Sequence, residues 1–309
     1  MTVKFNTEYE FYTADVFTDR PFGGNQLAVF PQASGLTTQQ MQNIASEFNI
    51  SETSFVFPSS SDGCTNLLRI FTPDAELPFA GHPTIGSAHI LSLIGNIRLD
   101  DKITKIVFEE GAGPVPVLIH MLDGHPVFVE LTAPQLPTFG LDHPSVKSIA
   151  NVLSLDISDI LYDRLKPQSV SCGLPFFFIP ISNRGAISKA QLNREIWERE
   201  FSSYWAPDFY LYTFDPESAG VDIRARMFGP SKGIGEDPAT GSAAVGLAGY
   251  LASLESNTDA TVRWKIEQGF EMGRQSFLNI EVDKKDGEIS AIRVGGSSVL
   301  VSKGVMYIP

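Results

Sequence analysis

The chain has 309 residues, of which 43% are hydrophobic and 19% are charged, the balance of a globular protein with enough apolar residues for a full core. Its 23 basic and 36 acidic residues give a formal net charge of −13, which argues against nucleic acids and acidic membranes as partners and favours a small molecule. The N-terminus lacks a signal-peptide pattern, and no apolar run reaches the roughly 18 to 20 residues that span a bilayer, so we expect a cytoplasmic protein.

The first half of the chain alternates between strand-like and helix-like segments. Apolar periodicity, caps and turn residues predict a mixed α/β arrangement. The predicted strands are 8–17, 27–30, 54–58, 67–73, 103–110, 115–122 and 125–131, and the predicted helices are 36–49, opened by Thr37 or Thr38, and 84–94. The second of these helices is apolar nearly all round, which is typical of a buried helix.

A proline-rich stretch over 132–146 is consistent with a linker, after which a second series begins. It contains a predicted helix over 145–153 and predicted strands over 176–181, 208–214, 222–228, 261–269, 276–282 and 291–304. The sequence therefore predicts two α/β domains, residues 1–130 and 131–309, and the last strand is a candidate to pair with the first domain.

An internal repeat links the two halves. Arg69-Ile-Phe-Thr-Pro73 recurs as Arg226-Met-Phe-Gly-Pro230, and each copy precedes a helix of small residues. Aligning these helices at Gly86 and Gly246 sets Gly81 on Gly241 and His82 on Ser242. Helices so rich in glycine and alanine can be enclosed closely by strands, so we expect each half to curl a sheet around its own central helix. The alternative is that two unrelated core helices share common small residues.

The two helix starts have unusual sequences. Pro83 in Ala80-Gly-His-Pro-Thr84 suits the first helical position, and in Glu236-Asp-Pro-Ala-Thr-Gly-Ser242 either Thr240 or Ser242 can cap the helix, while Gly241 lets backbone approach a ligand. Each start presents unpaired N–H groups and the positive end of a helix dipole. Together these features predict an anion-binding site at each start.

Four polar side chains near these segments are candidates for chemistry, and each also has a structural interpretation. Glu52 suits acid–base work if burial raises its pKa, but a glutamate at a strand entry is often solvated or capping. His82 can reach a ligand from its helix start, or be structural. Asp237 can act on a ligand or simply favour the helix dipole, and Asn25, in Gly23-Gly-Asn25, can bind substrate or stabilise its turn.

Several common site types lack support in the sequence. There is no GxGxxG, GxxxxGK[ST], HExxH or GxSxG motif, so no nucleotide, zinc-protease or hydrolase-elbow function is indicated and no cofactor or metal is expected. The two cysteines, Cys64 and Cys172, have no zinc spacing and are expected to be buried, reduced thiols.

Five segments taken together resemble the PhzF-like family, named for phenazine biosynthesis. They are Asp15–Asn25, Ser51–Val56, Arg69–Pro73, Ala80–Thr84 and Glu236–Ala243, in that order along the chain. The resemblance implies the diaminopimelate epimerase-like fold, with two similar domains, each a mixed sheet curled around a central helix, and the active site between them. The chain departs from the family pattern at Gln26, where a proline is common.

The resemblance also implies a reaction. The family's characterised member isomerises trans-2,3-dihydro-3-hydroxyanthranilate, and its catalytic pattern maps onto Glu52 as the acid–base group with His82, Asp237 and Ser242 assisting. Asn25, Gly81, Thr240 and Gly241 are then expected to bind the substrate. We therefore expect a cofactor-independent isomerase that moves a proton between carbons of a small carboxylated substrate, and a homodimer.

Two other functions remain open on the sequence. One is a ligand-binding protein that keeps the site without catalysis. The other is a racemase or epimerase with bases other than cysteine, because related racemases place a cysteine at each helix start and neither start contains one here.

Overall fold

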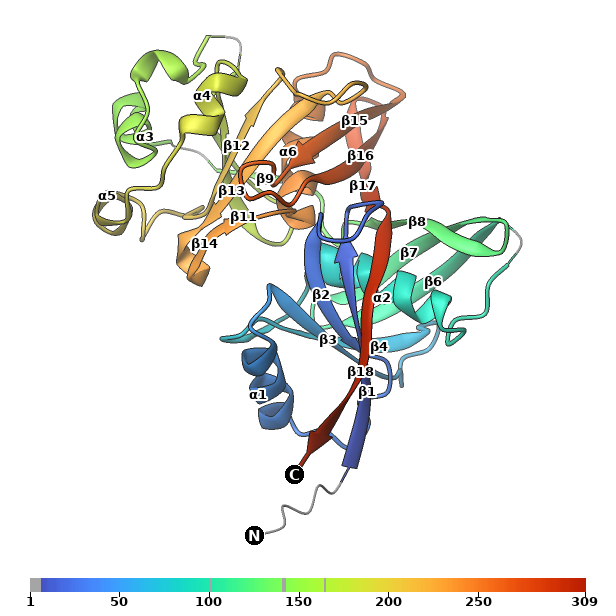
Figure 1. Cartoon of the computed structure of the whole chain (residues 1–309). Helices are drawn as coiled ribbons and strands as arrows, with labels where there is room; N and C mark the ends of the chain where they lie inside the picture. The colour runs from blue at the N-terminus through green and yellow to red at the C-terminus, as the bar shows by residue number, and fades with distance from the viewer. Residues whose placement is uncertain (1–6, 101, 141–142, 164) are drawn as a thin grey trace. The chain divides into compact units, whose positions relative to one another are not determined.

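The computed structural model describes residues 7–100, 102–140, 143–163 and 165–309 (Figure 1). It divides into two compact units, of which unit 1 comprises Met1–Pro134 with Gly295–Pro309 and unit 2 comprises Gln135–Val294. Residues 141 and 142 of the predicted linker lie outside the described residues. Among the described residues, no helix is long and apolar enough to cross a membrane.

Unit 1 is a mixed sheet with one helix inside its curve and one outside it. Its elements are β1 (Thr7–Val16), β2 (Asn25–Phe30), α1 (Thr38–Phe48), β3 (Glu52–Pro58), β4 (Asn66–Phe71), β5 (Glu76–Leu77), α2 (Gly81–Leu93), β6 (Ile103–Glu110), β7 (Gly113–Leu122), β8 (His125–Thr132) and β18 (Ser298–Ile308). The strands follow the order β18-β1-β2-β3-β4-β6-β7-β8, and the short β5 pairs with the end of β4.

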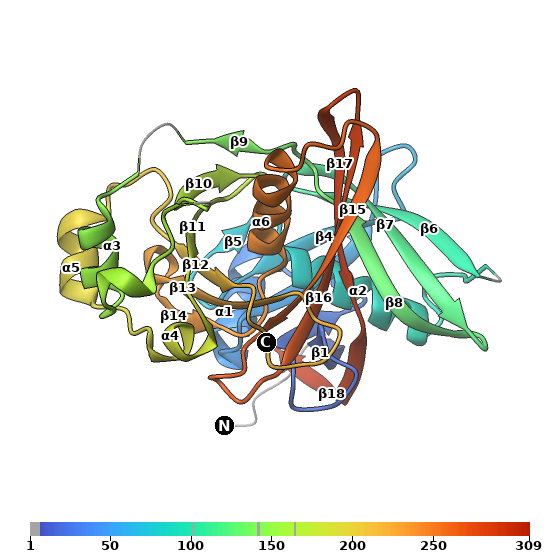
Figure 2. The ribbon, with the colours of Figure 1, turned by 90° about the horizontal axis from the view of Figure 1, so that it is seen from above.

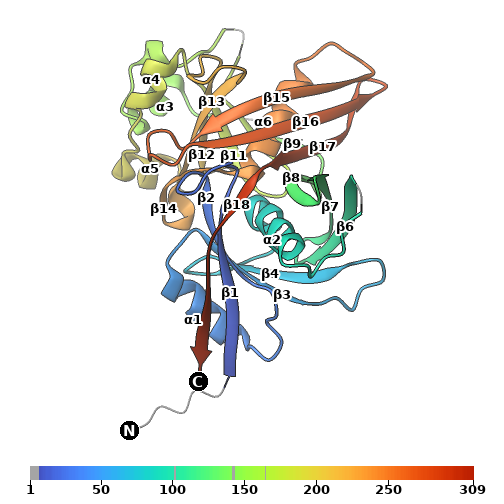
Figure 3. The ribbon, with the colours of Figure 1, turned by 45° about the vertical axis from the view of Figure 1, so that its right-hand side comes forward.

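Helix α2 is the central helix of unit 1. Its residues from Gly81 to Ser92 are all buried, and strands β1, β2, β3, β7, β8 and β18 pack around it (Figure 3). A Cβ on Gly86 would lie 2.5 Å from the Leu27 side chain and 2.6 Å from that of Val16, so only glycine allows this approach. Helix α1 packs on the outer face of the sheet, where Met41 and Ile44 join an apolar cluster with Phe30 and Phe55.

Unit 2 repeats this plan. Its elements are β9 (Thr138–Phe139), α3 (Val146–Val152), β10 (Gln168–Ser171), β11 (Pro175–Pro180), α4 (Arg184–Lys189), α5 (Arg194–Glu200), β12 (Phe209–Thr213), β13 (Ile223–Gly229), β14 (Ile234–Asp237), α6 (Gly241–Ser253), β15 (Ala260–Gln268), β16 (Ser276–Lys285) and β17 (Glu288–Gly296). Helix α6 is central and packs against β10, β11, β15 and β16 (Figure 2). Helices α3, α4 and α5 form the outer layer with Ile149, Ile187 and Trp197 in a second apolar cluster.

Strand pairing shows how far the duplication extends. In unit 1, β1, β2, β3, β4, β6 and β7 pair in the order antiparallel, parallel, antiparallel, parallel, antiparallel. In unit 2, β10, β11, β12, β13, β15 and β16 pair in the same order. The two central helices both have 13 residues and begin at Gly81 and Gly241, as the repeat predicts. The predicted α/β fold, with a sheet curled around a central helix in each half, is confirmed.

Some predicted elements differ from the structure. Helix α2 begins at Gly81 rather than Thr84 and places Pro83 third rather than first, because no residue of the first turn needs its N–H for an intrahelical bond. The predicted strand over 291–304 is two strands, β17 and β18, which end and begin on either side of Ser297. Helices α4 and α5 were not predicted, although Asn183 and Asn193 cap them. Cys172 is buried as expected, but Cys64 is only half-buried.

Candidate functional site

Glu52 is the first residue of β3, directly after the chain turns out of α1. Helix α1 begins after the Thr37 cap and ends at Asn49, whose left-handed backbone conformation redirects the chain. Strand β3 then enters the sheet between β2 and β4, with Glu52 opposite Leu27 of the parallel β2. The side chain is 11% exposed, so the sheet holds a nearly buried carboxyl group at the strand entry.

His82, the second residue of α2, contacts this carboxyl group. Its Nε2 lies 3.1 Å from Glu52 Oε2 and 3.3 Å from the backbone oxygen of Gln26, while its Nδ1 lies 3.3 Å from Asn25 Nδ2. The amide nitrogen of Asn25 can only donate, so Nδ1 accepts and the proton of the neutral ring lies on Nε2, where it is donated to the backbone oxygen of Gln26. Asn25 and His82 are therefore joined by a buried hydrogen bond, and the Glu52 carboxyl group lies against the other nitrogen of the same ring.

The ionisation state of His82 follows from its burial. Desolvation lowers the pKa of His82 to about 3, although the hydrogen bond to the Gln26 oxygen acts in the opposite direction. The ring is thus neutral at pH 7. A neutral ring places no positive charge beside the Glu52 carboxyl group, so that group remains able to accept a proton.

A tight turn between β1 and β2 places Asn25. A Cβ on Gly24 would lie 2.3 Å from the backbone oxygen of Val16, and its φ of +60° favours glycine, so no other residue fits there without a shift of the backbone. The buried Asp15 accepts a hydrogen bond from the backbone nitrogen of Phe22 at 2.6 Å, which ties the loop to β1. Asn25 itself is fully buried opposite Val16.

In unit 2 the counterpart of the His82 segment carries Asp237, Thr240, Gly241 and Ser242. Gly241 opens α6, and Ser242 takes the helix position that His82 has in α2. Thr240 is the residue before the helix, but its hydroxyl donates to Asp237 Oδ2 and neither Thr240 nor Ser242 caps the helix with its side chain, contrary to the prediction. The capping hydroxyl is engaged elsewhere because Asp237 is an ionisable acceptor within its reach.

A buried glutamine that the sequence analysis missed holds this segment together. Gln268, at the end of β15, accepts from the backbone nitrogen of Thr240 at 3.2 Å and donates to the backbone oxygen of Asp237 at 2.8 Å. Tyr210 donates to the same amide oxygen at 3.0 Å. No local spacing marks Gln268, because only the pairing of β15 with β13 brings it to Asp237.

Each unit also fixes its helix start with an arginine–glutamate pair. Arg69 donates to both oxygens of Glu76 at 2.7 and 2.6 Å, and Arg226 donates to both oxygens of Glu236 at 2.8 Å. Each glutamate stands five residues before the first residue of a central helix. These bidentate pairs, from the repeated Arg-x-Phe motif, restrain the strands β5 and β14 that lead into α2 and α6.

The strand registers also give Glu52 a counterpart. Thr53 is opposite Phe71 and Phe209 is opposite Phe228, and the repeat aligns Phe71 with Phe228, so the residue before β12, Asp208, corresponds to Glu52. Asp208 is buried and accepts from the Ser231 backbone and hydroxyl at 3.0 and 2.8 Å and from Lys232 Nζ at 2.9 Å. The counterpart carboxylate is thus neutralised by a lysine.

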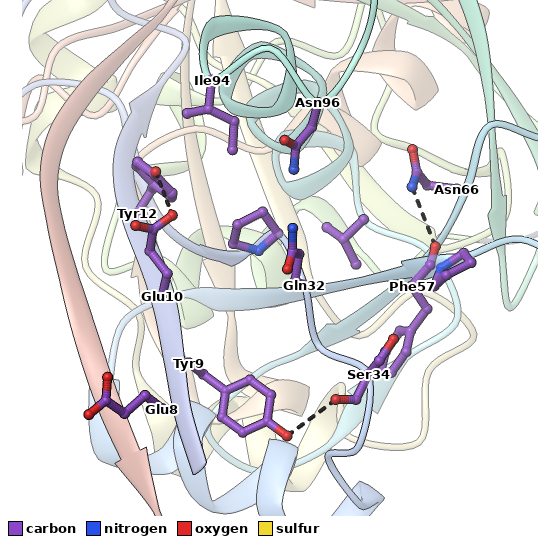
Figure 4. A pocket seen from close by; sticks show the side chains of 13 residues that line it. Glu8, Tyr9, Glu10, Tyr12, Gln32, Ser34, Phe57, Asn66, Ile94 and Asn96 are labelled. Atoms are coloured by element: carbon purple, nitrogen blue, oxygen red, sulfur yellow. Dashed lines mark hydrogen bonds between the residues drawn. The ribbon is translucent and has the colours of Figure 1, made fainter.

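A cavity in unit 1 is lined by none of the predicted site residues. It has a volume of about 740 Å³ and lies beyond the C-terminal end of α2, where Ile94 and Asn96 meet β1 and β3 (Figure 4). Tyr12 donates to Glu10 at 2.7 Å and Tyr9 donates to the backbone of Ser34 at 3.2 Å on its wall. Over the described ranges, no group of three or more histidine, cysteine, aspartate or glutamate side chains could hold a metal ion.

Comparisons with known proteins agree with these features. Residues 14–304 match the family model of the PhzC-PhzF phenazine biosynthesis-like proteins. The chain is 37% identical to an uncharacterized isomerase of Mesorhizobium japonicum, over 95% of this chain and 97% of that one. It is 32% identical to the trans-2,3-dihydro-3-hydroxyanthranilate isomerase of Pseudomonas aeruginosa, over 97% of this chain and 100% of that one.

The structural comparison gives the same result. The crystal structure of a PhzF-family phenazine biosynthesis protein from Bacillus anthracis superposes with a TM-score of 0.86 at 26% identity, covering 98% of this chain and 100% of that one. The fold is the diaminopimelate epimerase-like fold, and the Mesorhizobium japonicum and Pseudomonas aeruginosa relatives are named isomerases. The chain is therefore an isomerase that belongs to the PhzC-PhzF family of phenazine biosynthesis-like proteins.

Proposed function

We propose that the chain moves a proton between two carbon atoms of a small carboxylated substrate, with Glu52 as the group that removes and returns the proton. The observation that carries this proposal is the 3.1 Å contact between Glu52 and a neutral, buried His82. A carboxylate that lies against a neutral ring can take up a proton without first breaking a strong ion pair.

The proposed steps balance in protons and need no second base. Glu52 removes a proton from one carbon of the substrate, which leaves a delocalised carbanion, and the neutral carboxylic acid so formed returns the proton to another carbon. His82 holds Glu52 in position throughout, because its Nδ1 is itself held by Asn25. We assign to His82 and Asp237 the orientation of the substrate and polarisation of its substituents.

The substrate carboxylate is assigned to the helix starts. Ser242 and the first-turn N–H groups opened by Gly81 and Gly241 would bind it, with Asn25 and Thr240 as further contacts. The absence of a side-chain cap at the start of α2 and of α6 supports this assignment, because first-turn N–H donors are then available to an anion. The substrate class we propose is that of trans-2,3-dihydro-3-hydroxyanthranilate, the substrate in the name of the Pseudomonas aeruginosa relative.

Deuterium exchange tests the proposal directly. We expect the purified chain, in heavy water, to catalyse deuterium uptake into trans-2,3-dihydro-3-hydroxyanthranilate or into one component of a metabolite extract, detected by mass spectrometry. Glu52→Gln should lower this rate by about 10²- to 10⁴-fold, the usual contribution of a general acid–base group.

A matched variant controls for nonspecific effects of the substitution. Glu47→Gln, on the exposed face of α1, removes a carboxylate five residues away and should leave the rate at its wild-type value. The proposal is wrong if Glu52→Gln exchanges as fast as Glu47→Gln. Tight ligand binding with no exchange would instead indicate a binding protein, and exchange with inversion at a single carbon would indicate a racemase or epimerase.

We also propose that the chain acts as a homodimer. Four large apolar side chains on β18, Leu300, Val301, Val305 and Tyr307, are between 37% and 50% exposed, which supports burial of this strand against another copy. Sedimentation equilibrium of the purified chain tests this assembly.

A further inference from the structure

A second carboxyl group lies beside the start of α2, and the sequence analysis did not identify it. Glu110 is the last residue of β6 and is 4% exposed. Its Oε1 lies 2.7 Å from the hydroxyl of Thr84, two residues after His82, and its Oε2 has no hydrogen-bond partner among the described residues. An ionised carboxylate this deeply buried with one hydrogen bond would be costly.

The contacts of Thr84 indicate which group carries the proton. Thr84 Oγ1 lies 2.8 Å from the backbone oxygen of Ala80 as well as 2.7 Å from Glu110 Oε1. A hydroxyl has one proton, so it cannot donate to both oxygens at once. Both short contacts are hydrogen bonds if Glu110 is protonated, because it then donates to Thr84, which in turn donates to Ala80.

The duplicated fold supplies an independent argument. Leu67 of β4 is opposite Glu109 of the parallel β6, so Glu110 is opposite Leu68, and Ala225 of β13 is opposite Gln268 of β15. The aligned Arg69 and Arg226 each follow these residues directly, which makes Glu110 the counterpart of Gln268. In unit 2 this position is therefore held by a neutral amide that donates to the segment before the central helix.

The residues that follow confirm this correspondence. A Cβ on Gly111 would lie 2.9 Å from Pro78 Cα, and one on Gly269 would lie 3.1 Å from Pro238 Cα. Pro78 and Pro238 both stand three residues before the first residue of a central helix. The end of β6 and the end of β15 thus pack on equivalent points of the two segments, with Glu110 and Gln268 in equivalent places.

We propose that Glu110 keeps its proton at neutral pH and serves as a positioning residue, doing for the start of α2, through Thr84, what the amide of Gln268 does for the start of α6. Its effect on catalysis rests on the proposed function, since α2 places His82 against Glu52. Its protonation does not depend on that function and can be measured separately.

The surroundings of Glu110 agree with a neutral acid. Burial raises the pKa of Glu110 to about 8, against a smaller lowering by the Thr84 hydrogen bond. It shares a cavity of about 540 Å³ with Arg69 of β4, Glu76 of β5 and Glu109 of β6. Arg69 is paired with Glu76, Glu109 accepts from Ser59 at 2.5 Å, and α2 contributes His82 and His89, whose pKa values burial lowers to about 3 and about 4.

A pKa raised by folding has a definite consequence for stability. Between the pKa of about 4.5 in the unfolded chain and about 8 in the folded one, only the folded state holds this proton. The stabilisation is therefore complete below pH 4.5 and is lost progressively as the pH rises through 8. Above pH 8 the Glu110 carboxyl group is ionised, and the Thr84 hydroxyl can donate to only one of its two acceptors, Ala80 O and Glu110 Oε1. One hydrogen bond at the start of α2 is then lost.

Spectroscopy of the wild-type chain tests the protonation without any variant. In protein labelled with ¹³C at the glutamate carboxyl carbon, we expect one signal to remain that of a neutral acid at pH 7 and to titrate near pH 8. Isotope-edited infrared spectra should show the matching carboxylic acid band, absent in Glu110→Gln and present in Glu109→Gln. If every glutamate is ionised at pH 7, the proposal is overturned.

The pH profile of deuterium exchange tests the positioning role. Glu110→Gln keeps a neutral donor, so its alkaline loss of activity should begin at least roughly one pH unit above that of the wild type. Glu109→Gln, one residue away on the same strand, should keep the wild-type profile. If the alkaline limbs of the pH profiles are identical in Glu110→Gln and the wild type, the positioning role is overturned. The exchange rate of Glu52→Gln, by contrast, tests only the proposed function.

Discussion

At the scale of single residues, burial decides which groups carry charge. His82 lies in the first turn of α2 and Glu110 contacts Thr84 of the same turn; one is a base and the other an acid, and in both the charged form is disfavoured. Glu52 lies 3.1 Å from the neutral ring of His82. The two titratable groups in contact with Glu52 or with the first turn of α2 are therefore neutral at pH 7.

The neutral state of His82 has a measurable effect on acid stability. Its folded pKa of about 3 lies below the unfolded value of 6.5, so stability is lost as the pH falls from 6.5 towards 3. The expected loss is on the order of a few kcal/mol by pH 4. We expect ¹⁵N spectra to show a neutral Nε2–H ring for His82 at pH 5, assigned by its absence in His82→Gln.

A neutral His82 ring at pH 5 would distinguish a neutral contact between His82 and Glu52 from a charged pair. A doubly protonated His82 at pH 5 would mean that His82 and Glu52 form a true ion pair, and the proposed acid–base role of Glu52 would lose its support.

At the scale of elements, the two central helices depend on glycines at equivalent positions. A Cβ on Gly246 of α6 would lie 2.7 Å from the ring of Phe178, which is fully buried, just as one on Gly86 would meet Leu27 and Val16. The strands can approach these helices closely only because neither position has a side chain.

Alanine at these glycines should therefore reverse the usual preference for alanine in helices. Exposed glycine-to-alanine changes in a helix stabilise it by roughly 1 kcal/mol. We expect Gly86→Ala and Gly246→Ala each to destabilise the chain by about 1–3 kcal/mol, because the new methyl overpacks the core. Denaturant unfolding measures the change.

Gly235→Ala is the control for this prediction, since its new methyl group would have no atom within 4 Å apart from those of its immediate chain neighbours. It should change the stability by less than about 0.5 kcal/mol. Unchanged stability of Gly246→Ala would contradict the prediction and show that the Phe178 ring can move aside with little loss of free energy.

The elements also show what the sequence can and cannot predict. The small-residue pattern from Gly241 and the repeated Arg-x-Phe motif are local, and they predicted both central helices and the duplication. The roles of Gln268 and Glu110 arise from the parallel pairings of β13 with β15 and β4 with β6, whose partners are about 40 residues apart along the chain. Contacts of this kind depend on register, which composition and periodicity leave undetermined.

The expected contacts of Glu52 were predictable only in part. The resemblance named Glu52 and His82, but the neutral ring and the role of Asn25 as its donor depend on burial and on distances of 3.1 and 3.3 Å. The cap expected of Thr240 was wrong because Asp237, three residues earlier, competes for its hydroxyl.

At the scale of the whole molecule, chain order and folding units do not coincide. The last strand of the chain, β18, pairs with the first, β1, along almost its full length, with Thr7 opposite Ile308 and Val16 opposite Ser298 (Figure 1). Unit 1 is thus built from both ends of the sequence, whereas unit 2 is a single continuous segment with its own apolar clusters.

Truncation should reveal this difference. We expect residues 135–294 expressed alone to fold, because the segment contains its own central helix and apolar cluster. Residues 1–134 alone should lack cooperative unfolding, because β1 loses its β18 neighbour and exposes an open edge. Joining residues 295–309 ahead of residue 7 through a short flexible linker should restore it, as measured by circular dichroism.

A failure of the rejoined fragment to fold, together with folding of residues 135–294, would show that unit 1 needs more than its β18 partner. Equal folding of residues 1–134 with and without the added strand would show that the pairing of β1 with β18 is dispensable.

The duplication places a carboxylate at equivalent positions in the two units, Glu52 and Asp208, and the two have different partners. Asp208 accepts hydrogen bonds from Ser231 and Lys232, whereas Glu52 lies beside a neutral histidine. A reaction that relies on Glu52 alone has its proton donor and acceptor on one side of the substrate. The proton should then leave and return on the same face of the substrate.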